Sequence, residues 1–272
     1  MNKYNVITII LIIIASYYFI NKRESFDNQV IVNVYPYESD FGMGDYMRGI
    51  IHLYQTKDWN SIHINYSDNE IAKYLYNTTN TDYKTMTIPA RTNATTVFHN
   101  GTNVIHHNAT MEYPIEKKIL KQVRKMFTMK PDFKKYFLQK MKELELEKGK
   151  FVVIHLRYLD DVFNNDKDKS NIQLEKQIVD LITKHKTILL LSNSKIMKES
   201  LALKYKLKYF DTLPIHTGYI HSSIVDRIKD TLVEFFSMSY SKKIYQYCED
   251  KKQVSGFSKR VSEIYDVPLE II

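Results

Sequence analysis

The most uniform apolar stretch of the chain lies near its N-terminus. Residues 4–20 (YNVITIILIIIASYYFI) carry no charge, with Lys3 before them and Lys22 and Arg23 after them. At about 1.5 Å per residue, a helix of this length covers roughly 25 Å, the short end of what spans a bilayer. No small-residue cleavage site of a signal peptide follows it, and a buried core helix is seldom so free of charge. We expect residues 1–28 to be a membrane anchor and stem, with basic flanks that leave its orientation open.

The segment 29–112 alternates short β-branched runs with helical periodicity, which predicts an N-terminal α/β domain. A strand ends before Pro36, and a helix follows two closely spaced glycines. Between residues 83 and 110 we predict one short strand and no other regular element. The elements expected in this domain are strands at 29–35, 61–65 and 95–98 and helices at 45–54 and 68–76.

Residues 112–148 form a long, strongly basic stretch with helical spacing that is interrupted at Pro131. Its apolar positions fall on one stripe, and charged side chains surround them. This pattern predicts a solvated helical connector over 113–149. The stripe consists of Ile115, Ile119, Val123 and Met126.

A second α/β domain is predicted over 150–272. Nearly continuous apolar runs at 151–156 and 187–191 are typical of strands buried on both faces of a parallel sheet. Strands that alternate with helices of this length imply right-handed crossovers, so the fold class is α/β. The other elements expected here are strands at 207–210 and 243–247 and helices at 170–184, 194–205, 226–240 and 258–265.

Composition narrows the class of protein. The single cysteine, Cys248, excludes an intrachain disulfide framework and a cysteine-rich zinc site. The net charge is +8, but much of it sits in 117–150 without an aromatic stacking platform, so we expect no nucleic-acid partner. The histidines at 99, 106 and 107 lack helical ligand spacing, and we therefore predict no metal site.

Five N-glycosylation sequons fall between residues 65 and 110. A polar, loop-rich segment is one interpretation of this cluster, and a glycosylated lumenal or extracellular body is the other. We prefer the second, which places the body in the ER or Golgi lumen or outside the cell. The acceptor residues are Asn65, Asn77, Asn93, Asn100 and Asn108.

Polar side chains follow the predicted strands of the C-terminal domain, at the edge where open α/β sheets bind ligands. By alternation, His155 and Arg157 lie on the same side of the first strand. A guanidinium at a strand end can hold a diphosphate through two hydrogen bonds. The alternative is a structural ion pair between Arg157 and Asp160 or Asp161.

The second and third strand ends give weaker signals. Ser192 and Asn193 precede a helix, where a plain helix cap explains them as well as contact with a ligand does. His216 follows the third strand, either as a ligand contact or as an ordinary loop histidine.

The last helix opens with Ser255, Gly256, Phe257 and Ser258. Hydroxyls, a glycine and free N–H groups at a helix N-terminus can hold a phosphate or a base. A helix cap explains Ser258 equally well.

A second glycine-containing turn lies in the N-terminal domain. Gly42 and Gly44 allow a ligand to approach the backbone, and Asp45 and Arg48 follow in the helix that starts there. The third glycine, Gly49, is misplaced for a dinucleotide fingerprint, so the turn is a weak signal by itself.

Taken in chain order, these motifs resemble the fucosyltransferase superfamily that uses GDP-fucose, including the α1,2-, α1,6- and protein O-fucosyltransferases. The resemblance covers roughly residues 30–268. It implies a GT-B fold, in which two Rossmann-like halves face a cleft, and transfer with inversion and without a metal. The motifs are G-x-G-D-x-x-R-G at 42–49, H-L-R-x-x-D at 155–160, S-N-S at 192–194 and E-F-F-S-M-S…S-G-F-S at 234–258.

The resemblance also implies a role for particular residues. Arg157 would hold the diphosphate and His155 would line the donor site, and these two are the candidate catalytic residues. The remaining candidates would bind substrate. From the N-terminal domain these are Gly42, Gly44, Asp45 and Arg48, and from the C-terminal domain Asp160, Ser192, Asn193, His216, Glu234, Ser255, Gly256, Phe257 and Ser258.

The chain departs from the family pattern at two positions. Glu234 stands where Asp is more usual, as a helix residue that would position the nucleotide loop, and Asn193 also replaces an Asp. No carboxylate stands out as the general base, although Asp45 and Asp40 are candidates.

The resulting hypothesis is a membrane-anchored glycosyltransferase that needs no cofactor and moves fucose from GDP-fucose to a glycan or protein hydroxyl. Two alternatives remain: a related transferase with another nucleotide sugar, and a non-catalytic, membrane-anchored binding glycoprotein with the same fold.

Overall fold

The computed structural model describes residues 30–34, 42–56, 61–65, 70–76, 98–100, 103–105, 113–157, 172–212, 225–248 and 254–272. No helix within these ranges is long and apolar enough to cross a membrane, and the anchor expected at 4–20 lies outside them. Asp160 and His216 also lie outside the described residues.

A four-stranded sheet organises the N-terminal half, in the order β2-β1-β4-β3. β1 pairs in parallel with β2 and β4, and β3 runs antiparallel to β4. The strands are β1 (Val30–Val34), β2 (Ser61–Asn65), β3 (Phe98–Asn100) and β4 (Asn103–Ile105), and helix α2 (Met43–Thr56) follows β1 in the chain. The strands at β1 and β2 and helix α2 confirm the sequence predictions, whereas β4 was not predicted.

The helix expected at 68–76 is wrong. The described residues of this segment, 70–76, form a single 3₁₀ turn, η1 (Glu70–Lys73), and Leu75 then pairs with Met129 in an isolated antiparallel bridge. The backbone of this segment therefore bonds to the connector: the N–H of Tyr76 donates to Thr128 O at 3.0 Å, and that of Lys130 to Tyr74 O at 2.8 Å.

The basic stretch forms two helices, α3 (Lys117–Met126) and α4 (Pro131–Glu143). Pro131 opens α4, where its missing N–H leaves no helical hydrogen bond unmade. α3 buries part of the expected stripe, and α4 buries a second one that was not predicted, so the connector is a packed element with one solvated side. The buried residues are Ile119, Val123 and Met126 on α3 and Phe133, Phe137 and Met141 on α4.

A five-stranded, wholly parallel sheet organises the C-terminal half, in the order β7-β6-β5-β8-β9, which confirms the α/β class. Its last strand, β9, was not predicted. The strands are β5 (Val152–Arg157), β6 (Ile188–Ser192), β7 (Lys208–Tyr209), β8 (Lys243–Cys248) and β9 (Leu269–Ile271). The helices are α6 (Ile172–Lys184), α7 (Lys195–Tyr205), α8 (Val225–Tyr240) and α9 (Gly256–Tyr265).

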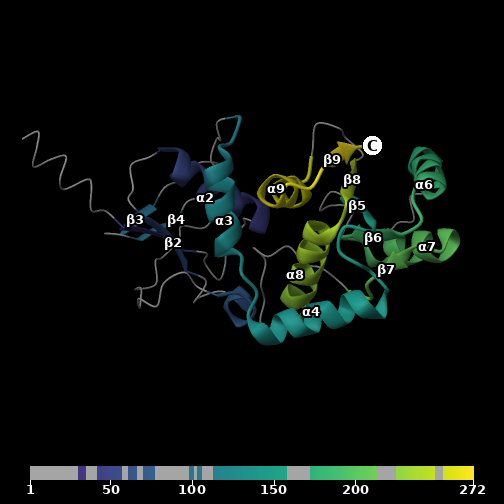
Figure 1. Ribbon diagram of the computed structural model, residues 1–272, viewed down its shortest axis with the longest axis horizontal. Coiled ribbons are helices and arrows are strands. Elements are labelled where there is room, and N and C mark those ends of the chain that lie inside the picture. Colours follow the sequence, from purple (N-terminus) through teal and green to yellow (C-terminus); the bar gives the residue numbers. More distant parts are fainter. Residues whose placement is uncertain are drawn as a thin grey trace, which may run out of the picture.

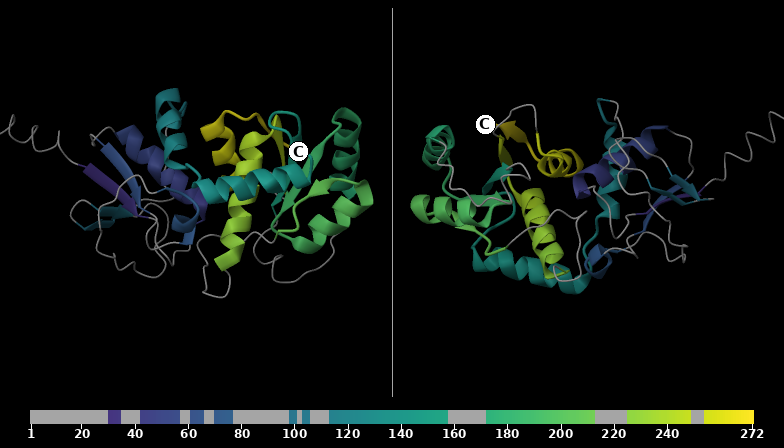
Figure 2. Two further views of the ribbon diagram at one scale, coloured as in Figure 1. Left: turned by 60° about the horizontal axis from the view of Figure 1, so that its bottom comes forward. Right: turned by 180° about the vertical axis from the view of Figure 1, so that it is seen from behind.

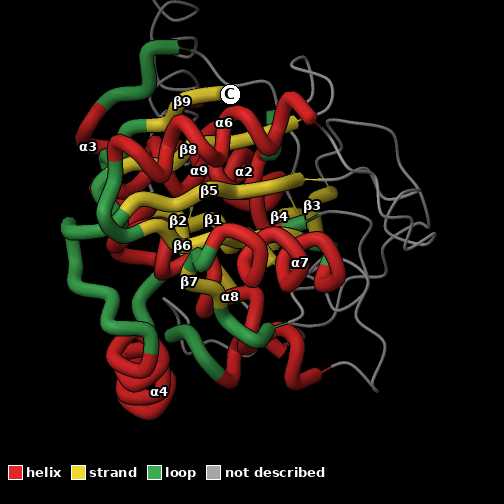
Figure 3. The backbone as a smooth tube through the Cα atoms, turned by 90° about the vertical axis from the view of Figure 1, so that its right-hand side faces the viewer, coloured by secondary structure: helices red, strands yellow, loops and turns green. Residues whose placement is uncertain are grey.

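The two faces of this sheet carry different helices. Ile154 and Leu156 of β5 pack in one buried cluster with α6 and α7, while Val153 belongs to another cluster with α8 and α9. Figure 3 shows α6 and α7 on the outer face of the sheet. α8 and α9 occupy the inner face, between the two sheets (Figure 1).

The inner-face cluster continues into the N-terminal half. It joins buried side chains of α2, α3 and α4 to those of β5, α8 and α9, without a break at the connector. α4 lies along the C-terminal half, with one end where the two halves meet (Figure 2). α9 packs against α2 and α3 as well as α8, so its first turn lies where the two halves meet.

Candidate functional site

The first turns of α2 and α9 are in direct backbone contact. A Cβ atom at Gly44 would lie 2.7 Å from the carbonyl carbon of Gly256 and 2.9 Å from the nitrogen of Phe257. No side chain fits there, because real Cβ atoms do not approach backbone so closely. Gly42 closes the turn before α2, and its carbonyl accepts hydrogen bonds from Asp45 N at 3.0 Å and Tyr46 N at 3.2 Å.

Arg48 lies one turn further along α2. Its Nη2 is 3.9 Å from where a Cβ of Gly256 would stand and 3.7 Å from Oδ1 of Asp45. The glycine-containing turn and the start of the last helix, far apart in the sequence, are thus brought together, and a half-buried guanidinium lies beside their contact.

The carboxyl ends of β5 and β8 lie side by side next to α9. His155 pairs with Gln246, and Arg157 with Cys248, in the parallel register. Paired residues point to the same face, and for these four it is the α8 and α9 face that Val153 also occupies. The ring of His155 lies 6.1 Å from that of Phe257, centroid to centroid.

His155 is held as a neutral imidazole. It is 5% exposed, and its Nδ1 has no hydrogen-bond partner among the described residues. Burial and, to a smaller extent, the positive charge of Arg157 lower its pKa to about 3. At neutral pH the ring can exchange a hydrogen bond with a bound molecule, but it does not carry a positive charge.

The first turn of α9 contains backbone N–H groups that have no partner within the helix. Ser255 occupies the N-cap position but makes no side-chain capping hydrogen bond, and the first helical bond runs from Lys259 N to Ser255 O at 3.2 Å. The N–H groups before Lys259 therefore have no partner within the helix, and the helix dipole favours an anion beside them.

The predicted start of this helix at Ser258 is wrong, because α9 begins at Gly256. Ser258 is fully buried, and its hydroxyl donates to Oε1 of Gln246 at 2.6 Å. It therefore faces the sheet and is not the helix cap.

The end of β6 is committed to starting α7. Oγ of the buried Ser192 accepts from Ser194 N at 3.0 Å, and Oγ of Ser194 accepts from Met197 N at 3.4 Å, as an N-cap. Helix capping thus accounts for the serines of the S-N-S motif. Asn193 is half-buried between them, and its contact with a substrate stays a prediction.

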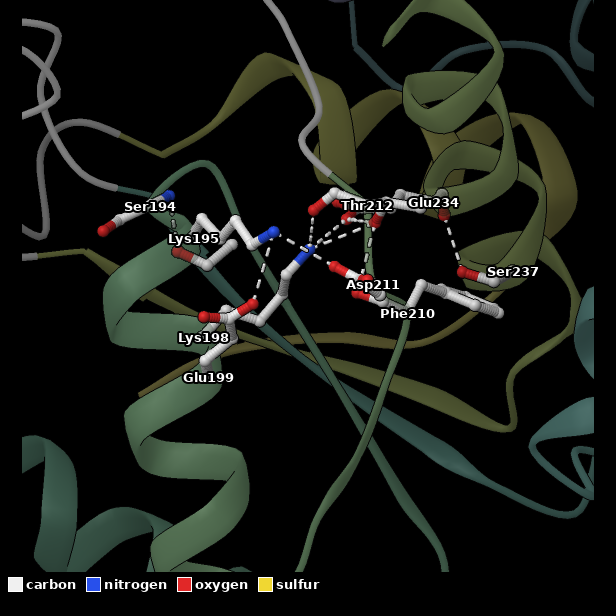
Figure 4. Close-up of polar contacts among 10 residues, drawn as sticks. Ser194, Lys195, Lys198, Glu199, Phe210, Asp211, Thr212, Glu234 and Ser237 are labelled. Atoms are coloured by element: carbon white, nitrogen blue, oxygen red, sulfur yellow. Dashed lines mark hydrogen bonds and ion pairs between the residues drawn. The ribbon is translucent and has the colours of Figure 1, made fainter. Parts of the chain in front are cut away.

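Glu234 lies in a buried polar cluster that Figure 4 shows in close-up. Its Oε1 accepts hydrogen bonds from Lys198 Nζ at 3.1 Å and Thr212 Oγ1 at 2.8 Å, and Lys198 also donates to the carbonyl of Thr212. Burial raises the pKa of Glu234, while Lys198 and Thr212 act in the opposite direction. The carboxylate thus ties α8 to α7 and to the segment after β7.

Two hydrogen-bond partners of the candidate residues were not predicted from the sequence: Lys198, which bonds to Glu234, and Gln246, which bonds to Ser258. Lys198 is a lysine on an amphipathic helix, which ordinarily faces solvent, and Gln246 stands inside a strand that reads as apolar and aromatic. The described part of the chain contains no group of three or more His, Cys, Asp or Glu side chains placed to hold a metal ion.

No protein-family model and no curated protein sequence matches the chain. Among solved structures it is similar to NodZ alpha-1,6-fucosyltransferase soaked with GDP-fucose, with a TM-score of 0.53 and 9% identity over 89% of this chain and 94% of that one. The same enzyme co-crystallised with GDP gives a TM-score of 0.51 and 8% identity over 86% and 91%. POFUT1 in complex with GDP-fucose gives a TM-score of 0.37 and 13% identity over 63% and 55%. At these identities the likeness to NodZ shows a shared fold.

Proposed function

We propose that this chain is a fucosyltransferase-like glycosyltransferase with GDP-fucose as its donor. One observation carries the proposal: the first turns of α2 and α9 meet beside the strand end that carries His155 and Arg157. These are the segments that the family resemblance assigns to substrate binding, on the two sides of the cleft. The fold supports the proposal, because it is shared with an enzyme whose structures were obtained with GDP-fucose and with GDP.

The proposed reaction is a displacement at the anomeric carbon of fucose. The bond from that carbon to the β-phosphate oxygen breaks and GDP leaves with the electron pair, while the acceptor hydroxyl oxygen forms the new bond with inversion. Negative charge develops on the departing diphosphate. Arg157 and the free N–H groups of α9 would stabilise it, which is the largest contribution such a site makes without a metal.

The acceptor proton must go to a base. Asp45 is the candidate within the described residues, because it lies in the first turn of α2 beside Arg48.

We further propose that the acceptor is a glycan or protein hydroxyl, and that residues 4–20 anchor the body on the lumenal or extracellular side of a membrane. The uncharged segment and the five sequons support this placement.

The proposal is tested by nucleotide-dependent stabilisation. GDP should raise the melting temperature of the protein more than UDP or ADP does, since a ligand that binds the native state stabilises it. Arg157→Ala should abolish the shift, and Arg157→Lys, which keeps the charge but loses the planar fork, should retain only part of it. An unchanged GDP shift in Arg157→Ala would show that the site is wrongly assigned.

Turnover then separates an enzyme from a binding module. The wild-type protein should release GDP from GDP-fucose in the presence of EDTA, either by hydrolysis or by transfer to members of an acceptor array. Binding of GDP without any release would support the non-catalytic alternative.

A further inference from the structure

A buried amide connects β8 to the first turn of α9. Gln246 is 0% exposed and lies within the parallel sheet, on the face that α9 covers. Its Oε1 accepts the hydroxyl of Ser258 at 2.6 Å, and its Nε2 lies 3.0 Å from the Sγ of Cys248. The side chain thus bonds at one end to the helix and at the other to the end of its own strand.

Burying an amide at this point is costly unless both ends are paired. An unbranched apolar residue of similar length, such as methionine, would fill a similar space without the two hydrogen bonds. The polar side chain therefore adds direction to the contact: a hydrogen bond to Ser258 fixes the rotation of α9 about its axis, which packing alone fixes less well.

The same turn is held from the opposite side. Gly44 of α2 lies against the backbone of Gly256 and Phe257, so α9 meets the N-terminal half there without an intervening side chain. The turn that makes these two contacts carries the N–H groups of Gly256, Phe257 and Ser258, which have no partner within the helix. Their direction depends on how the first turn is rotated.

We infer that Gln246 is a positioning residue, which aims the free N–H groups of α9 at the diphosphate of the nucleotide. This rests on the proposed function, because it takes the anion beside α9 to be the diphosphate of GDP. Gln246 itself need not touch the nucleotide. Its predicted effect is therefore confined to the phosphate-dependent part of binding.

The test compares Gln246→Met with a control on the same strand, Tyr245→Phe. Tyr245 points to the opposite face of the sheet, where its hydroxyl lies 2.9 Å from His185 Nε2. The control variant therefore also loses a partly buried hydrogen bond. Two properties are measured for each protein: amide hydrogen exchange, and the affinities for GDP and for guanosine by calorimetry.

In Gln246→Met we expect faster exchange of the amides of residues 259–261, with protection of β5 and β8 unchanged. Affinity for GDP should fall about tenfold while affinity for guanosine changes less than about twofold, since the inference assigns the diphosphate, and not the base, to the N–H groups of the helix terminus. Tyr245→Phe should leave both the exchange of α9 and the GDP affinity as in the wild type.

Two results would overturn the inference: unchanged exchange at 259–261, or an equal loss of GDP and guanosine affinity in Gln246→Met. A wild-type protein that binds neither ligand would instead remove the proposed function. The exchange measurement, which needs no ligand, would then still decide whether Gln246 holds the first turn of α9.

Discussion

His155 lowers the stability of the fold at acidic pH and also offers a hydrogen-bonding atom to a bound molecule. A histidine at the end of a buried strand must stay neutral, because the protonated ring would lose its hydration and would lie near the cation of Arg157. The same burial leaves Nδ1 without a partner among the described residues, at a strand end close to Phe257. The residue therefore lowers stability at acidic pH while offering a hydrogen-bonding atom to a bound molecule.

This burial predicts a pH-dependent stability. The pKa of His155 is about 3 in the folded state and about 6.5 in the unfolded chain, so the unfolded state takes up the proton first as the pH falls. The free energy of unfolding is therefore unaffected by this titration above pH 6.5. Between pH 6.5 and pH 3 it falls as the pH falls, by at most about 1.4 kcal/mol per pH unit. We therefore expect the free energy of unfolding, measured by urea denaturation, to fall less steeply between pH 6.5 and pH 5 in His155→Gln than in the wild type.

A control variant exists in the same domain. The pKa of His185 is also lowered, mainly by burial, but its ring is only half-buried and bonds to Tyr245. His185→Gln should therefore change the slope less than His155→Gln does. Parallel pH profiles for the wild type and His155→Gln would contradict the assignment.

At the residue scale, the sequence predicts side chains that depend on one element and misses those that depend on several. Strand alternation is enough to place His155 and Arg157 on one face. The partners of Glu234 could not be inferred in the same way, because Lys198 and Thr212 come from two other elements. The packing of α7 against α8 determines that Lys198, among the many lysines of the chain, is the one that is buried here.

At the scale of elements, the contact between α2 and α9 depends on a single missing side chain. At Gly44 an added Cβ would overlap the backbone of Gly256, which cannot move without shifting a helix. At Gly256 the nearest atom to an added Cβ is Arg48 Nη2 at 3.9 Å, an ordinary contact with the end of a flexible side chain. The two glycines of one contact thus differ in what they tolerate.

This asymmetry predicts opposite outcomes for two alanine substitutions. Gly44→Ala should destabilise the protein by about 1–3 kcal/mol, the usual cost of overpacking, and should weaken GDP binding because α9 is displaced. Gly256→Ala should change the free energy of unfolding by less than about 1 kcal/mol. Urea denaturation of both variants checks this, and an equal cost for the two would show that the helices are not in backbone contact.

The buried pair of Lys198 and Glu234 predicts a second effect at this scale. Lys198→Met removes one partner and leaves the carboxyl group buried, which should cost about 3–5 kcal/mol at neutral pH. The cost should shrink as the pH falls, because burial raises the pKa of Glu234 and the loss of Lys198 removes a charge that opposes this rise. The buried carboxyl group then takes up a proton more readily. The double variant Lys198→Met with Glu234→Leu should recover most of the loss, and a double variant as unstable as the single one would contradict this account.

Long elements were predicted better than short ones. Most strands and helices of the C-terminal domain follow from apolar runs and helical periodicity over five residues or more, and the two-residue β7 lies within the short run predicted at 207–210. β4 and β9, with three residues each, contain too few positions to show a period, and they form because a neighbouring strand offers backbone partners. The sequence also could not distinguish η1 from a longer helix. The end of η1 is set by the bridge between Leu75 and Met129, which are far apart in the chain.

At the scale of the whole molecule, one buried hydrophobic cluster joins α2 of the N-terminal half to α8 and α9 of the C-terminal half. The sequence divides the chain into two α/β domains with a connector, and that division favours two cores that fold separately. In the structure, α3 and α4 bury apolar stripes against elements of both halves, and α9 packs on α2, α3 and α8. The proposed donor site lies on this shared core, at the contact between Gly44 and Gly256.

A shared core predicts that the described body unfolds in one cooperative transition. Met47 on α2 and Leu181 on α6 are both almost fully buried, but Met47 belongs to the cluster that joins the halves, and Leu181 belongs to the cluster on the outer face of the C-terminal sheet. Each alanine substitution should cost about 2–5 kcal/mol and lower the same melting temperature, because neither half keeps its core when the other is lost. Scanning calorimetry should give a calorimetric enthalpy equal to the van't Hoff value in the wild type and in both variants. Two separate transitions, with Met47→Ala moving only one of them, would mean that the halves are stabilised independently and that α9 is not held in place by α2.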